Sequence, residues 1–202
     1  MPAPEHSVGP IPAGRDADEY DRERRRVLWS MPSGLFVLGS RFEGRLNMMT
    51  CNWAMQVATV PKLVAVSVEA GSLTRVLIDR GGSFSLSVLP RSERAVIRRF
   101  VKPVDGIDLD VDGRATSLQG VSVFEVADGL PCVSSALSWL ACVVRHSIGW
   151  DADTDAEGTD GASHVLFVGE VVDVGERAEA DGHVADESEA LQMGDTRMNY
   201  GG

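Results

Sequence analysis

Cysteine is scarce in this chain of 202 residues. The three cysteines, Cys51, Cys132 and Cys142, form no CxxC pair, and an odd number of thiols cannot all be bridged. The pattern favours a reducing compartment and small buried thiols over a disulfide framework. The four histidines are scattered, without HExxH spacing, so the sequence predicts no metal site.

Long apolar runs and the common catalytic motifs are missing as well. No segment approaches the roughly 20 apolar residues that span a bilayer, and the N-terminus MPAPEHSVGPIPAG lacks the apolar core of a signal peptide. We therefore expect a cytoplasmic protein that does not associate with membranes. There is also no Walker-type loop, no GxGxxG after a strand and no GxSxG, which excludes the commonest nucleotide and hydrolase folds.

Positive charge is in deficit, with a net charge of -11. Residues 151–195 hold fourteen acidic side chains against Arg177 alone, so the remaining chain sums to about +2. Long-range repulsion of phosphate argues against a nucleic-acid partner. The acidic stretch WDADTDAEGTDGAS fails as an EF-hand loop counted from Asp151, because positions six and twelve of that loop are Ala156 and Ala162, so we interpret it as a solvated hairpin loop.

The elements expected along the chain are strands with few short helices. Residues 1–15 form a flexible segment, and 16–202 form one domain. The pattern predicts helices over 16–30, 73–80 and 92–101, the last of them with Ser92 as its N-cap. Strands are predicted over 33–40, 45–59, 62–69, 83–89, 121–126, 137–144 and 164–174, with a turn at Glu43-Gly44 and a loop over 102–113. We expect SFSLSVL to be half-buried, with its serines facing solvent. Without βαβ alternation, these elements predict an antiparallel barrel or sandwich.

Two stretches have features that point to a ligand. NMMTCNW mixes apolar and polar side chains without the alternation of an ordinary strand. In VSVEAGSLT, Ser72 and Thr74 stand at the start of a helix, where free N–H groups and the helix dipole favour an anion. Simple N-capping by Ser72 is the alternative. The basic segment RSERAVIRRFVK either supplies a cation to that anion or is a solvated face.

Taken in order, SGLFVLGS, NMMTCNWAMQVATVPKLVAVSVEAGSLTRVLIDRGGSFSLSVL, RRFVKP and SHVLFVGEVVDV resemble the flavin reductase-like family with the FMN-binding split-barrel fold. The resemblance covers residues 27–175. It implies a mainly β, antiparallel split barrel with a few short helices, and a homodimer that binds FMN, or FAD, near the subunit interface.

The resemblance also implies roles for particular residues. Met49, Thr50, Cys51, Asn52 and Trp53 would lie along the isoalloxazine. Ser67, Val68, Glu69, Ser72, Leu73 and Thr74 would follow the ribityl chain to the phosphate. Arg99, Phe100 and Lys102 would supply a phosphate-side cation or packing. His164 would lie near the nicotinamide side of the flavin, or would only pack at the start of its strand.

Three functions are compatible with these observations. The first is an oxidoreductase that takes hydride from NADH or NADPH and passes electrons to free flavin or to a partner such as a monooxygenase. The second is a non-enzymatic FMN electron carrier of the flavoredoxin type. The third is an interaction module that kept the fold without the cofactor, with the acidic region as its contact surface.

Overall fold

The computed structural model describes residues 11–149, 164–177 and 189–196. The chain divides into two compact units, Met1–Pro32 with Arg197–Gly202, and Ser33–Thr196. The domain boundary expected near residue 15 stays a prediction. In the described part of the chain, no helix is long and apolar enough to cross a membrane. The acidic loop expected over 150–163 lies outside the described residues.

The first unit contains the helix α1 (Ala17–Trp29), which begins where the sequence predicts. The side chain of Asp16 accepts a hydrogen bond from the Glu19 N–H at 3.0 Å and so caps the helix. Acidic side chains lie in its first turn and Arg26 lies in its last, as the helix dipole favours. No residue of α1 is buried.

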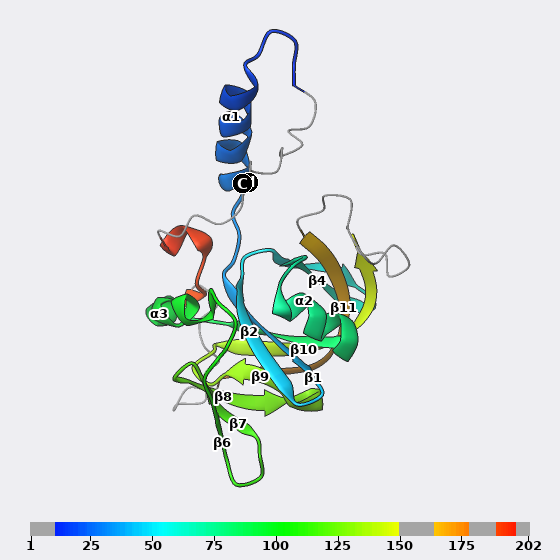
Figure 1. The fold of residues 1–202 in the computed structure, drawn as a ribbon, viewed down its shortest axis with the longest axis vertical. Coiled ribbons are helices and arrows are strands. Elements are labelled where there is room, and N and C mark those ends of the chain that lie inside the picture. Colours follow the sequence, from blue (N-terminus) through cyan, green and yellow to red (C-terminus); the bar gives the residue numbers. More distant parts are fainter. Residues whose placement is uncertain (1–10, 150–163, 178–188, 197–202) are drawn as a thin grey trace. The chain divides into compact units, whose positions relative to one another are not determined.

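The second unit consists mainly of antiparallel strands, which confirms the mainly β fold (Figure 1). A seven-stranded sheet has the order β2-β1-β5-β10-β11-β4-β3, and a four-stranded sheet has the order β6-β7-β8-β9. The strands are β1 (Phe36–Phe42), β2 (Arg45–Cys51), β3 (Ala54–Thr59), β4 (Lys62–Glu69), β5 (Ser83–Val88), β6 (Ile107–Leu109), β7 (Ala115–Leu118), β8 (Val121–Val126), β9 (Leu130–Val133), β10 (Ser138–Ile148) and β11 (His164–Glu176). The helices in the described part of this unit are α2 (Leu73–Gly81), η1 (Arg91–Glu93), α3 (Arg94–Ile97), η2 (Arg98–Phe100), η3 (Ala127–Gly129) and η6 (Met193–Asp195).

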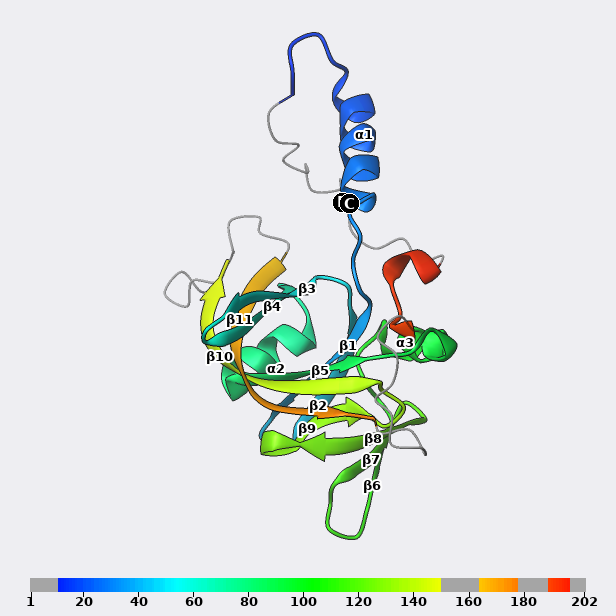
Figure 2. The same cartoon turned by 180° about the vertical axis from the view of Figure 1, so that it is seen from behind.

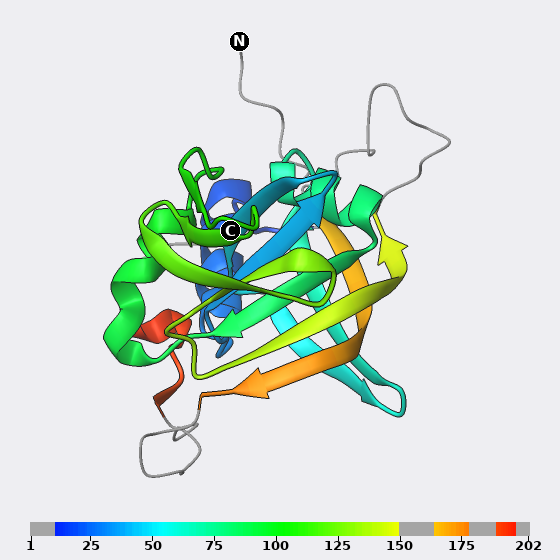
Figure 3. The ribbon, with the colours of Figure 1, turned by 90° about the horizontal axis from the view of Figure 1, so that it is seen from below.

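The larger sheet curves around the main core, as the views from behind and from below show (Figures 2 and 3). Helix α2 packs against β1 and β2 (Figure 2). The core cluster comprises Leu38, Cys51, Val64, Val66, Val68, Ile78, Phe84, Leu86, Cys142, Val165 and Phe167. It therefore draws on most strands of the larger sheet and on α2.

The predicted segment 45–59 is two strands, β2 and β3, and not one. The interruption falls at Asn52 and Trp53, inside the stretch that lacks alternation. The hairpin before it forms as predicted, because Glu43 and Gly44 both adopt positive φ angles (46° and 77°) in the turn that joins β1 to β2. The short strands β6, β7 and β9 were not predicted, and β6 falls within the expected loop 102–113.

The prediction that β5 is half-buried is wrong, since Ser83, Ser85 and Ser87 are all buried. Strand β9 covers their face. The Ser85 hydroxyl donates to the Pro131 carbonyl at 2.6 Å, and the Ser87 hydroxyl accepts from the Val133 N–H at 3.0 Å. Ser85 and Ser87 can be buried here because each hydroxyl has a backbone partner on the other sheet.

The helix predicted over 92–101 is a shorter and mixed element. It consists of a 3-10 turn from Arg91, four α-helical residues and a second 3-10 turn that ends at Phe100. Ser92 lies inside the first turn and does not cap it, and Pro90 occupies the N-cap position. The Thr50 hydroxyl donates to the Ile97 carbonyl at 2.6 Å, and this competes with the helical hydrogen bond that would continue α3.

Replacement of Ser85 by alanine tests the contact between the two sheets. The substitution leaves the buried Pro131 carbonyl without its hydrogen bond, so we expect Ser85→Ala to lower the free energy of unfolding by about 1 to 3 kcal/mol. Ser147→Ala, at an exposed position on β10, is the matched control. Urea denaturation of both variants measures the difference, and equal midpoints would contradict the structural role of this bond.

Candidate functional site

The break between β2 and β3 exposes a tryptophan at a fixed place. The Trp53 carbonyl accepts a hydrogen bond from the Ser67 N–H of β4 at 2.9 Å, and the backbone of Trp53 also hydrogen-bonds the buried Cys51 thiol. Trp53 itself is 41% exposed. Asn52, beside it, is partly exposed.

His164 at the start of β11 meets this tryptophan. The two rings lie edge to face, with centroids 4.7 Å apart and an angle of 64° between their planes. In the β4–β11 pairing, His164 stands opposite Glu69. Trp53, His164 and Glu69 thus form one partly exposed cluster at the end of β4, although they come from three separate segments.

Two opposing effects act on the imidazole of His164. Burial lowers its pKa below the ordinary value of 6.5, and the nearby Glu69 carboxylate raises it to a smaller extent. The net direction is downward. His164 is therefore predominantly neutral at pH 7, when it can both accept and donate a hydrogen bond.

The N-terminus of α2 follows this cluster directly. The Ser72 N–H donates to the Glu69 carbonyl at 3.0 Å, and the Ser72 hydroxyl caps the helix by accepting from the Arg75 N–H at 3.1 Å. Ser72 therefore caps α2, which is the alternative that the sequence left open for this residue. Within the described part of the chain, the N–H groups of Leu73 and Thr74 form no hydrogen bond, as is usual for the first turn of a helix.

The site residues predicted near α2 differ in how accessible they are. Ser67, Ser72 and Leu73 are partly exposed, whereas Val68 packs in the core and Thr74 is buried. The Thr74 hydroxyl accepts a hydrogen bond from the Asn47 side chain at 2.8 Å. On β2, Thr50 and Cys51 are buried, and Met49 is partly buried against the core.

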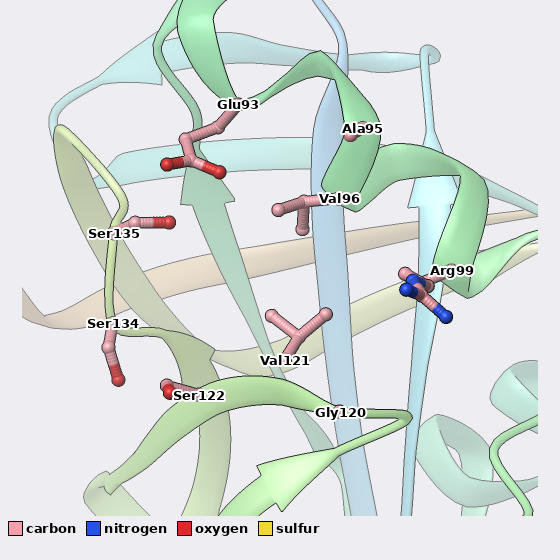
Figure 4. A pocket seen from close by; sticks show the side chains of 9 residues that line it. All are labelled: Glu93, Ala95, Val96, Arg99, Gly120, Val121, Ser122, Ser134 and Ser135. Atoms are coloured by element: carbon pink, nitrogen blue, oxygen red, sulfur yellow. The ribbon is translucent and has the colours of Figure 1, made fainter.

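The three site residues predicted in the basic segment, Arg99, Phe100 and Lys102, lie in different environments. Phe100 is fully buried, Lys102 is exposed, and Arg99 lines a pocket of about 490 Å³ (Figure 4). The pocket is lined by Glu93, Ala95, Val96, Arg99, Gly120, Val121, Ser122, Ser134 and Ser135. Glu93 and Arg99 stand on opposite sides of it, with Val96 and Val121 between them (Figure 4). Of the predicted site residues, only Arg99 reaches this pocket.

The cysteines are unsuited to nucleophilic or redox chemistry. Burial raises the pKa of Cys51 and of Cys142 to about 12 and that of Cys132 to about 11. All three are free and buried, as the sequence predicts. Among the described residues, no group of three or more His, Cys, Asp or Glu side chains is arranged to hold a metal ion.

Sequence analysis missed Asn47, the buried side chain that connects several of these segments. It belongs to the irregular stretch NMMTCNW, and a polar residue within a strand was the available signal. Its partners lie far away along the chain, so their identity was not evident from the sequence.

Comparison with known proteins identifies the family. The model of the flavin reductase like domain matches residues 28–197, so the chain belongs to that family. The NADH-dependent flavin reductase StyB of Pseudomonas fluorescens is 29% identical over 125 residues, which cover 61% of this chain and 66% of StyB. The chain therefore spans just under two thirds of the length of this relative.

Solved structures agree on the fold. Nitrilotriacetate monooxygenase component B from Mycobacterium thermoresistibile has a TM-score of 0.62 at 21% identity, covering 81% of this chain and 80% of that one. An FMN-binding protein from Thermus thermophilus has a TM-score of 0.60 at 22% identity, covering 91% and 86%. The split-barrel fold expected from the sequence is confirmed.

The lowered pKa of His164 predicts how stability depends on pH. The unfolded chain binds a proton near pH 6.5 and the folded chain only at lower pH, so the free energy of unfolding falls as pH drops below about 6.5. We expect this loss in the wild type and a smaller one in His164→Gln. Urea denaturation between pH 5 and 8 measures it, with His146→Gln, which alters an exposed histidine, as the control. A wild-type profile that matches His164→Gln would contradict the lowered pKa.

Proposed function

We propose that this protein is an FMN-binding flavin reductase, which takes hydride from NADH or NADPH and passes electrons to free flavin or to a partner enzyme. One observation carries the proposal. The Trp53–His164 ring pair, the end of β4 and the N-terminus of α2 form a continuous series, linked by the Glu69–His164 pairing and the Ser72–Glu69 hydrogen bond. An aromatic surface and an anion-binding helix end therefore belong to one site.

The residues present fit a flavin mononucleotide. A flat ring with one polar edge requires apolar and polar neighbours side by side, and Trp53, Asn52 and Ser67 offer both at the break in β2–β3. A phosphate requires N–H donors and positive potential, which Leu73 and Thr74 offer at the start of α2. We assign the phosphate contact to these backbone groups, because the buried Thr74 hydroxyl already bonds Asn47.

Bound FMN would supply the redox chemistry, accepting hydride and releasing electrons. The chain's own residues would orient the ring, keep water from one of its faces and hold the nicotinamide nearby. His164, neutral at pH 7, would hydrogen-bond the nicotinamide through a ring nitrogen without adding a charge to the site. No residue of the chain needs to transfer a proton, and the three protonated cysteines take no part.

The family and its members support the donor and the acceptor. StyB is an NADH-dependent flavin reductase, which supports NADH as the donor here. A structural neighbour is a component of a monooxygenase, which supports a monooxygenase as the partner that consumes reduced flavin. Three free, buried thiols are consistent with a reducing compartment, and we place the protein in the cytoplasm.

We further propose a homodimer. Strand β3 is the terminal strand of the larger sheet, and its side chains Met55 and Val57 are 66% and 47% exposed. Apolar side chains on a sheet edge favour association with a second copy. An interface on β3 would also lie next to Trp53, which directly precedes this strand.

An assay with added flavin tests the activity. We expect NADH oxidation, followed at 340 nm, to depend on FMN, and flavin fluorescence to saturate with about one FMN bound per chain. Parallel assays with FAD in place of FMN, and with NADPH in place of NADH, show which flavin and which electron donor the protein prefers. Flavin binding with negligible oxidation of either nucleotide would contradict a reductase and favour an electron carrier. Absence of flavin binding would overturn the cofactor assignment.

Light scattering tests the dimer. We expect a mass of twice 21.7 kDa for the wild type. Val57→Glu places a charge on the apolar edge and should shift the mass toward that of one chain. Thr59→Glu, at an exposed polar position of the same strand, is the control and should leave the dimer intact. A monomeric wild type, or a dimeric Val57→Glu, would contradict an interface on β3.

A further inference from the structure

Asn47 is a buried polar side chain that the flavin-binding residues themselves do not include. It lies on β2 and is 2% exposed. Its amide group makes two hydrogen bonds to separate segments. Nδ2 donates to the Thr74 hydroxyl at 2.8 Å, and Oδ1 accepts from the Val104 N–H at 2.8 Å. Because a backbone N–H can only donate, Val104 fixes which end of the amide is the oxygen.

The two partners belong to the two segments at the phosphate end of the proposed site. Thr74 lies in the first turn of α2, where the free N–H groups are. Val104 lies in the segment after η2, residues 101–106, which also contains the exposed Lys102. One amide group therefore holds the anion-binding helix end and the neighbouring cationic segment to the same strand.

Asparagine is well matched to this position. It offers a donor and an acceptor at the end of a short side chain, whereas aspartate lacks the donor and leucine lacks both. The Ser40 hydroxyl donates to the Asn47 carbonyl, although this bond is long at 3.4 Å, so the backbone of Asn47 is also tied to β1. The side chain is thus held on a paired strand while it bonds outward to α2 and to the segment after η2.

We infer that Asn47 is a positioning residue that sets the affinity for the flavin phosphate without touching the flavin. The inference rests on the proposed function. Loss of either hydrogen bond would let α2 and the segment after η2 move independently, and small displacements of N–H donors weaken binding of an anion. The ring end of the site depends on other bonds, chiefly Ser67 to Trp53, which do not involve Asn47.

A comparison of two ligands separates positioning from general stability. Riboflavin has the same ring and ribityl chain as FMN but no phosphate. A residue that acts through the phosphate seat changes the FMN affinity and leaves that of riboflavin unaltered. A residue that merely supports the fold changes both affinities or neither.

The experiment uses the full chain with Asn47→Leu, which keeps the volume and removes both hydrogen bonds, and with Asn47→Ala in case leucine prevents folding. Flavin fluorescence titrations give the dissociation constants for FMN and for riboflavin. We expect the FMN constant to rise about tenfold or more, as the loss of roughly 1.4 kcal/mol implies, and the riboflavin constant to stay within about twofold. The thermal midpoint of each variant reports folding.

Ser85→Ala is the matched control, since it removes another buried hydrogen bond, from β5 to β9, which involves neither Asn47 nor its two partners. It should lower stability and leave the ratio of FMN to riboflavin affinity unchanged. A double variant with Thr74→Val should weaken FMN no more than Asn47→Leu alone, because both changes break the same bond. Equal weakening of FMN and riboflavin in Asn47→Leu, or no weakening of FMN, would overturn the positioning role.

The wild type distinguishes failure of this inference from failure of the proposed function. Wild-type chain that binds FMN more tightly than riboflavin supports the phosphate seat, and the Asn47 variants then decide its dependence on this amide. Wild-type chain that binds neither flavin would overturn the proposed function and this inference with it.

Discussion

The arrangement of the site depends on hydrogen bonds that buried polar side chains of β2 make with other segments of the chain. Asn47 reaches α2 and the segment after η2, and Thr50 reaches the last carbonyl of α3. All of these bonds are buried or nearly so, where an unpaired polar group would cost more than the bond contributes in water. The segments joined in this way are close neighbours in space despite wide separation along the chain. A strand of seven residues thereby determines where two helical segments stand.

The junction of the two sheets rests on a second set of polar contacts. Besides the serines of β5, the Arg41 guanidinium of β1 bonds both the Glu125 carboxylate at 2.9 Å and the Gly129 carbonyl at 3.1 Å. The other carboxylate oxygen of Glu125 accepts from the Ala115 N–H at 2.8 Å. Gly39 permits this close approach, since a Cβ there would lie 2.2 Å from the Pro131 carbonyl oxygen. Directional polar bonds thus help to join the smaller sheet to the larger one.

The local parts of this fold are predictable from sequence, and the distant contacts are not. The turn at Glu43-Gly44 and the N-cap at Ser72, which the sequence offered as an alternative, depend on neighbouring residues, and both form. The burial of Ser85 depends on a partner 46 residues away, so alternation within β5 gave the wrong face assignment. Asn47 likewise depends on residues 27 and 57 positions away. Of the candidate site, the resemblance identified Trp53, Ser72 and His164, and the structure places them in one series; it also shows that Phe100 and Thr74 are buried.

The chemistry of the three thiols has a consequence for a protein that handles reduced flavin. Reduced flavins react with dioxygen to give peroxide, and peroxide attacks thiolates far faster than thiols. Cys51, Cys132 and Cys142 are buried, and each has a pKa several units above neutrality. At pH 7 almost none of them is ionised or accessible. The three thiols are therefore protected from the oxidant that the proposed reaction would generate.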